Sequence, residues 1–205
     1  MSCYTREQIE AAVKSKNYKW FEDVNNKGYD VNIVGIRNSK TKGRVTNAFD
    51  DCITISYKID GEWQFHCFPC TTDPGSHWVK NVLSDKGVAI LKPNQYRGSH
   101  KLRLHQGKYL ALGQKKPVTV YRDNNLDSNY DLDESKTETG IFGINIHRAT
   151  GRSGGKSTRI DKWSAGCQVI ADNDDWHQFL DICQSAREIH GNSFSYTLIE
   201  SKEII

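Results

Sequence analysis

The sequence predicts a mainly β, α+β fold: an antiparallel β domain of the sandwich or barrel-like kind, with a short N-terminal helix and a C-terminal helix. Three observations predict it. Apolar residues alternate with polar ones over much of the chain, which is the period of a half-buried strand. Turn-forming residues separate these runs. Helical spacing of apolar residues occurs only near the two ends, and 205 residues are enough for a substantial core.

Capping residues mark both helices. Thr5 and Gln8 form a capping box ahead of Ile9, and further apolar residues follow at helical spacing. Near the C-terminus, the acidic run 172–174 supplies an N-cap. The helix that follows has one apolar face, made of Trp176, Phe179, Leu180, Cys183 and Ala186.

Strands are predicted between the helices. Residues 53–59 and 63–67 alternate in polarity around Asp60-Gly61, a strong hairpin turn. The polar segment 38–47 is expected to be a loop. It divides the chain into an N-terminal helix and strand appendage, 1–45, and a β-rich domain, 46–205, with one continuous domain as the alternative. Further strands are expected at 31–36, 87–91, 109–112, 118–121, 141–146, 168–170 and 194–199.

Composition narrows the classes of function. The formal net charge of +3 is compatible with an anionic polymer such as a cell wall, but it is too weak to argue for nucleic acid. No apolar run reaches membrane-spanning length, so no membrane segment is expected. The first residues lack the basic and then apolar pattern of a secretory signal. We therefore expect synthesis in the cytoplasm without a signal peptide.

The six cysteines are irregularly spaced, which does not indicate a disulfide scaffold. Cys67 and Cys70, preceded by His66, have the spacing of half a zinc site or of a redox pair. No second ligand pair follows them, so packed thiols are the expected reading. Cys183 is expected to be a small core residue of the C-terminal helix.

Cys167 and His147 form the main candidate site. His147 ends one apolar, β-like run, and Cys167 lies in a Ser-x-Gly-Cys turn that opens another. An imidazole beside a thiol can take its proton and produce the nucleophilic thiolate. Gly166 lets the backbone turn sharply and aim N–H groups at an oxyanion. Ser164 is expected to orient the turn, with substrate contact as the alternative. A buried histidine and a buried cysteine without chemistry remain the structural alternative.

These residues resemble a known signature. His147, followed by Ser164, Gly166 and Cys167, is similar to the motif of the L,D-transpeptidase (YkuD) catalytic domain, and the resemblance covers roughly residues 85–170. It implies a β-rich L,D-transpeptidase-type fold, a catalytic Cys–His pair, and acyl transfer on the stem peptides of bacterial peptidoglycan. No cofactor is expected to be required for catalysis.

The sequence departs from the family pattern at three positions. Ala165 stands where a second histidine is usual, which removes one polar group that would help a tetrahedral intermediate. Val169 stands where an arginine or asparagine is common, so a substrate contact is missing. Arg148 replaces a small residue after the histidine and is a candidate substrate-binding residue. We therefore read the chain as a divergent member whose substrate or acceptor has changed.

Two further groups of residues are candidates for binding. Tyr96 and Arg97 would suit a peptide with free carboxylates, with exposed loop residues as the alternative. An acidic segment repeats the alternating oxygen ligands of an EF-hand-type calcium loop, although Ser128 replaces the usual glycine and no helices flank it. A structural calcium site and a plain acidic loop both remain open there. The candidate ligands are Asp123, Asn125, Asp127, Asn129, Asp131 and Glu134.

The sequence leads to a cysteine peptidase or transpeptidase that acts on peptidoglycan stem peptides. The missing signal peptide and the missing histidine favour hydrolysis, as in a phage endolysin or cell-wall peptidase that reaches the wall after release or delivery by another system. An L,D-transpeptidase that forms cross-links is the first alternative. A non-catalytic cell-wall-binding module and a cysteine hydrolase acting on a non-wall amide are the others.

Overall fold

The computed structural model describes residues 4–204. Its α-helices are α1 (Arg6–Ser15), α2 (Ser76–Lys80) and α3 (Asn173–His190), and its short 3₁₀ helices are η1 (Ser39–Thr41), η2 (Glu134–Lys136) and η3 (Ser201–Glu203). The strands are β1 (Asn32–Arg37), β2 (Asp51–Ile59), β3 (Glu62–Thr71), β4 (Val88–Leu91), β5 (Asn94–His105), β6 (Tyr109–Gln114), β7 (Val118–Asp123), β8 (Thr137–Gly140), β9 (Ile146–Arg148), β10 (Gln168–Ile170) and β11 (Phe194–Glu200).

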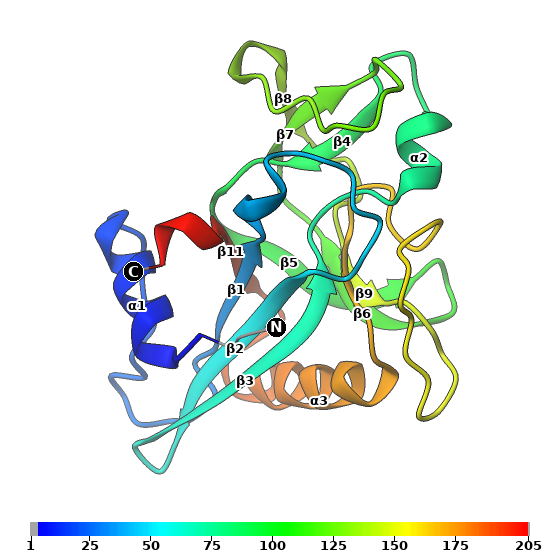
Figure 1. Ribbon diagram of the computed structural model, residues 1–205. Helices are drawn as coiled ribbons and strands as arrows, with labels where there is room; N and C mark the ends of the chain where they lie inside the picture. Colours follow the sequence, from blue (N-terminus) through cyan, green and yellow to red (C-terminus); the bar gives the residue numbers. More distant parts are fainter. Residues whose placement is uncertain (1–3, 205) are drawn as a thin grey trace.

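Eight strands close a barrel in the order β1-β11-β5-β6-β9-β10-β3-β2, and β4, β7 and β8 form a separate small sheet, which lies at the top of Figure 1. The predicted β-rich α+β fold is confirmed. The expectation of an antiparallel domain is wrong at two pairs, because β1 runs parallel to β11 and β9 runs parallel to β10. Parallel neighbours need a long connection. The loop 149–167 provides it between β9 and β10.

Helix α1 packs on the outside of the barrel. The predicted capping box is present: the Gln8 N–H donates to the Thr5 hydroxyl at 3.3 Å, and the Thr5 N–H donates to the Gln8 side chain at 3.0 Å. Ile9 of α1 belongs to the same buried cluster as Val34 and Ile199 of the barrel wall. Strand β1 is therefore buried on both faces and lies between β11 and β2. The division at residue 45 does not hold for this strand, which is part of one continuous barrel.

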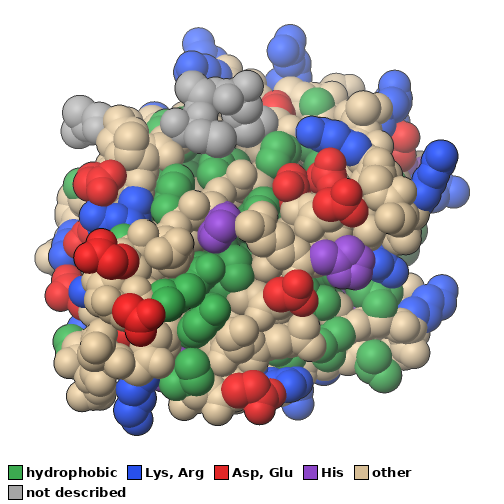
Figure 2. All heavy atoms as spheres, turned by 90° about the horizontal axis from the view of Figure 1, so that it is seen from below, with side chains coloured by type: hydrophobic (Ala, Val, Ile, Leu, Met, Phe, Trp, Pro, Cys, Tyr) green, Lys and Arg blue, Asp and Glu red, His purple; other side chains and the backbone are tan. Residues whose placement is uncertain are grey.

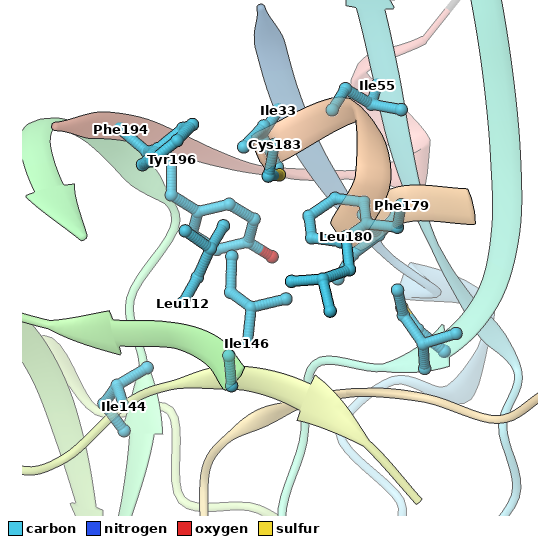
Figure 3. Packing of buried hydrophobic residues seen from close by; sticks show 14 of the residues in the cluster. Ile33, Ile55, Leu112, Ile144, Ile146, Phe179, Leu180, Cys183, Phe194 and Tyr196 are labelled. Atoms are coloured by element: carbon cyan, nitrogen blue, oxygen red, sulfur yellow. The ribbon is translucent and has the colours of Figure 1, made fainter. Parts of the chain in front are cut away.

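Helix α3 lies across the lower end of the barrel in Figure 1. Its N-cap is Asp172, as the sequence predicts, and the carboxylate accepts the Asp174 N–H at 2.9 Å. Phe179 and Cys183 are fully buried. Figure 3 shows them on α3, turned toward the barrel side chains that include Tyr196 and Leu112. Burying a large apolar side chain contributes about 1.5–3 kcal/mol, so α3 is a main source of the barrel's stability.

Strand β5 is the largest element that the sequence does not reveal. Its inward side chains are Tyr96, His100 and Leu102, whereas its outward positions are charged, so polar residues hide the alternation. The sequence also predicts a strand at 141–146 that is mostly absent. Of these residues only Ile146 belongs to a strand, β9. Phe142 and Ile144 are held instead by hydrogen bonds to the Gln114 side chain. Strand β8 and helix α2 were not predicted either.

On one face of the molecule, charges of both signs are mixed. Figure 2 shows one face of the molecule with basic and acidic side chains interspersed and small apolar areas between them. Within the described residues, no helix combines the length and the apolar character needed to cross a membrane.

Candidate active site

Two adjacent parallel strands bring His147 and Cys167 to one cavity. His147 belongs to β9 and is the register partner of Val169 in β10, and Cys167 directly precedes β10. Both residues line a cavity of about 740 Å³. Its other walls include Trp78, Leu83, His105, Lys108, Tyr109, Arg148, Lys162, Trp163 and Ala165. Val169 itself is fully buried in the barrel wall, so this position is closed to substrate.

The turn before Cys167 is fixed by Ser164 and Gly166. The buried Ser164 hydroxyl donates to the Cys167 carbonyl at 2.8 Å and accepts the Gly166 N–H at 3.1 Å. Gly166 has a φ of +127°, and a Cβ there would lie 2.2 Å from the Ala89 carbonyl oxygen. Only glycine fits this turn.

The hydrogen bonds of Ser164 limit which backbone N–H groups of this turn can bind an oxyanion. The Gly166 N–H is occupied by Ser164, so it is not free to bind an oxyanion. The Cys167 N–H makes no hydrogen bond within residues 4–204, so it is the backbone donor of this turn that stays available.

The Cys167 thiol is protonated and hydrogen-bonded at rest. It donates to the Gly143 carbonyl at 3.3 Å, and the Asn145 backbone N–H is hydrogen-bonded to the sulfur. Burial raises the pKa of Cys167 to about 11, and the Asn145 contact offsets only part of this. Among the described residues no hydrogen bond joins this sulfur to His147. The fold brings the pair into one cavity, and a direct contact between them stays a prediction.

His147 is held as a neutral base. Its Nδ1 lies 2.8 Å from the Arg148 carbonyl oxygen, which can only accept, so Nδ1 carries the proton and Nε2 is left unprotonated. The Tyr109 hydroxyl lies 3.4 Å from the same Nδ1. Burial lowers the pKa of His147 to about 4. At neutral pH the ring is therefore unprotonated at Nε2, and the same burial makes it a weak base.

Side chains from three strands pack around His147. The ring of His105, at the end of β5, stacks on it with centroids 4.4 Å apart. The Arg148 guanidinium lies 4.3 Å from the centroid of the Tyr109 ring and donates to Asn173 at 3.2 Å. The candidate substrate-binding residue Arg148 thus lies in the cavity of Cys167, and its position is fixed.

Two buried polar residues that the sequence did not single out hold the segment facing the thiol. The Gln114 side chain accepts the N–H groups of Phe142 and Ile144 at 3.1 and 2.9 Å and donates to the Gly140 carbonyl at 2.9 Å. The His100 Nε2 lies 2.9 Å from the Ile144 carbonyl oxygen. Neither residue belongs to a sequence motif. Both lie among polar residues, so the sequence gives no sign that they are buried.

Cys167 lies where three cavities meet. A second cavity, of about 230 Å³, includes Arg103, Leu104 and Gly143. A third, of about 200 Å³, includes Leu83, Arg122 and Phe142. The rims carry exposed apolar side chains, among them Leu83, Leu104 and Trp163. A peptide bound at the sulfur can therefore contact the walls of more than one cavity.

The candidate binding residues Tyr96 and Arg97 lie elsewhere. Tyr96 is buried inside the barrel, and its hydroxyl donates to the Lys92 carbonyl at 2.6 Å. It does not line the cavities at Cys167, and its assignment to substrate binding stays a prediction. Arg97 points outward from β5, with its guanidinium 5.1 Å from the centroid of the Phe21 ring, and it lines a different cavity.

The acidic loop uses its oxygens locally. Asp123, Asn125 and Asp127 each accept the backbone N–H two residues further on, at 3.4, 3.1 and 2.6 Å. Asp131 pairs with Lys136, and Glu134 pairs with Lys92. Asn129 forms a β-bridge with Arg44. Within residues 4–204 no three His, Cys, Asp or Glu side chains are grouped to hold a metal ion. Calcium binding by this loop stays a prediction.

The other cysteines have no visible chemical role. Cys52, Cys70 and Cys183 are buried free thiols, and burial raises the pKa of Cys70 and Cys183. Cys67 is partly exposed and lies in β3. Cys3 lies outside the described residues.

The chain matches no protein-family model, and comparisons with curated proteins and with solved structures find no match either. The geometry of the site and its chemistry are therefore the basis for assigning a function.

Proposed function

We propose that this protein is a cysteine acyl-transfer enzyme that acts on peptidoglycan stem peptides. Its acyl-enzyme intermediate is resolved mainly by hydrolysis. One observation carries the proposal: Cys167 and His147 line the same cavity, and the Arg148 carbonyl leaves Nε2 of His147 free to accept a proton. The substrate class rests on the similarity of His147, Ser164, Gly166 and Cys167 to the L,D-transpeptidase signature.

The reaction follows from these groups. The thiol leaves the Gly143 carbonyl and gives its proton to Nε2 of His147 as the sulfur attacks the substrate carbonyl. The oxyanion forms beside the free Cys167 N–H. The C–N bond then breaks, the leaving amine takes the proton from His147, and a thioester remains on Cys167. Water, deprotonated by His147, attacks the thioester and restores the thiol.

The charge of the cavity walls favours hydrolysis over transpeptidation. The residues that line the three cavities at Cys167 include Arg103, Lys108, Arg148 and Lys162, together with Arg122, whose charge is paired with Glu138. They include no aspartate or glutamate. Such walls attract the carboxylates of a stem peptide and repel the ammonium form of an amine acceptor. Water meets no such opposition, and the small Ala165 leaves room for it.

The test is incubation of purified sacculi with the protein, followed by mass analysis of the muropeptides. Shortened stems or cut cross-links with wild-type protein, and none with Cys167→Ala, are the expected result. Cys67→Ala is the matched control, since it removes another partly exposed thiol and should leave the products unchanged. Full activity of Cys167→Ala would overturn the proposal.

The same experiment separates the alternatives. New dimers in place of shortened stems would identify a transpeptidase. Sedimentation of wild-type protein and of Cys167→Ala with sacculi, without any product, would identify a binding module. Products from a non-wall amide alone would identify the third class of enzyme.

A further inference from the structure

A fourth cavity, of about 330 Å³, shares no lining residue with the three cavities at Cys167. It lies between the segment that follows α1, the start of β5, the β6–β7 turn and the turn from α3 to β11. The residues that concern its chemistry are Phe21, Asp30, Arg97, Gly98, Lys116, His190, Ser193 and Ser195. Its volume is at the small end of the range for ligand pockets.

Two cations in this cavity have no counter-ion. Within residues 4–204, neither Arg97 nor Lys116 forms an ion pair with a carboxylate. The Arg97 guanidinium stacks over the Phe21 ring at 5.1 Å, which holds its plane and leaves its N–H groups unpaired. A guanidinium fixed in this way loses little freedom when it binds an anion.

Two further titratable groups of the cavity, Asp30 and His190, contact the neighbouring loop. The Asp30 carboxyl accepts the Asp23 backbone N–H, and burial raises the pKa of Asp30. Nε2 of His190 lies 2.7 Å from the Gly28 carbonyl oxygen. Both side chains therefore hold the segment 23–30 in place. They do not neutralise Arg97 or Lys116.

Two polar groups pack closely over Gly98. A Cβ at this residue would lie 3.1 Å from the Ser193 hydroxyl and 3.3 Å from the Lys116 ammonium. The Gly98 N–H donates to the Ser195 hydroxyl at 3.0 Å, so the hydrogen of that hydroxyl remains free to donate. Donors from Ser193, Ser195 and Lys116 thus lie together at Gly98, and among the lining residues of the cavity Asp30 is the one carboxylate.

We propose that this cavity is a binding site for the phosphate group of a small or polymeric phosphate ester. The donors come from separate segments, β5, the β6–β7 turn and the turn before β11. They surround a volume, which matches the tetrahedral oxygens of a phosphate better than the plane of a carboxylate. The site does not depend on acyl transfer at Cys167.

The test is calorimetric titration of the full chain with three probes at low salt. Glucose 6-phosphate represents a phosphate monoester, a glycerol phosphate oligomer represents a phosphodiester chain, and glucuronate is the carboxylate control. Binding of either phosphate, with glucuronate clearly weaker, supports the site and shows which kind of ester it takes. Glucuronate that binds as tightly as the phosphates, or no heat with either phosphate, would overturn it.

Variants show where the probe binds. Arg97→Gln and Lys116→Gln should each weaken phosphate binding by roughly tenfold or more, because each removes a charge-assisted hydrogen bond. Lys80→Gln is the control: it removes the same charge from an exposed residue of α2 and should change nothing. Cys167→Ala should also bind as wild type does, so that failure of the acyl-transfer proposal leaves this test intact. Equal binding by all four variants would refute the site.

Discussion

The imidazole rings of His105 and His147 are stacked 4.4 Å apart, with an angle of 25° between their planes. His105 comes from the end of β5 and His147 from β9, so two strands that are not neighbours in the barrel meet through these rings. The contact gives His105 two effects on the base: it limits the rotation of the His147 ring, and a charge on it opposes protonation of His147.

Replacing His105 by alanine should raise the pKa of His147, because burial is the main cause of its low value and His105 adds to the effect. The acid limb of the pH–activity profile, which reports neutral His147, should then move from about 4 toward the ordinary histidine value of about 6.5. His105→Phe keeps a stacked ring without the charge and should shift the limb less. NMR titration of His147 in the three proteins measures the effect, and an unchanged pKa in His105→Ala would contradict it.

The reaction rate of Cys167 with iodoacetamide should keep rising beyond pH 9. Burial raises the pKa of this thiol to about 11, so at pH 7 only about one molecule in ten thousand carries the thiolate. A resting thiolate–imidazolium pair would instead give a rate that levels off below pH 7. The experiment uses Cys67→Ala protein, which lacks the other partly exposed thiol among the described residues.

Gly166→Ala should destabilise the fold strongly. The new Cβ would lie 2.2 Å from the Ala89 carbonyl oxygen, and φ is +127°. Backbone strain alone costs about 1–3 kcal/mol, and the clash adds to it. Gly107→Ala is the matched control, because Gly107 also has a positive φ, +71°, but no atom lies within 4 Å of its Cβ position. Urea unfolding should show the larger loss for Gly166→Ala, and equal losses would refute the steric argument.

His100 should make stability fall in acid. Burial lowers its pKa to about 4 in the folded protein, against about 6.5 in an unfolded chain. Between these values the unfolded state binds more protons, so stability is full above pH 6.5 and is lost as the pH falls toward 4. In His100→Gln, which keeps a donor for the Ile144 carbonyl, the free energy of unfolding should fall less over this range. Parallel pH curves for the two proteins would contradict the prediction.

Sequence patterns could predict the parts of this fold that depend on local chemistry. The caps at Thr5 and Asp172 and the hairpin at Asp60 are set by neighbouring residues, and all three are present. The pairing of β9 with β10 depends on how a long loop returns, and no local pattern contains that information. For the same reason, Tyr96 looked like a surface residue although its hydroxyl is satisfied inside the barrel.

The same distinction between local and long-range contacts applies to the candidate site. Ser164 and Gly166 act within a few residues of Cys167, so a short motif reveals them. His105 and Gln114 act on His147 and on the segment before it across the barrel. Their positions follow from the closed sheet, which a single sequence does not display.

The place of β11 in the barrel has a consequence for how the chain reaches its native state. This strand, Phe194–Glu200, is hydrogen-bonded to β1 on one side and to β5 on the other. On the ribosome, β1 and β5 therefore emerge long before the strand that joins them, and each keeps an unpaired edge until residue 200 is free. Unpaired edges invite association with other chains. Late closure also makes folding slow, because distant segments must meet first. Chains still being made are therefore expected to need a chaperone until β11 has emerged.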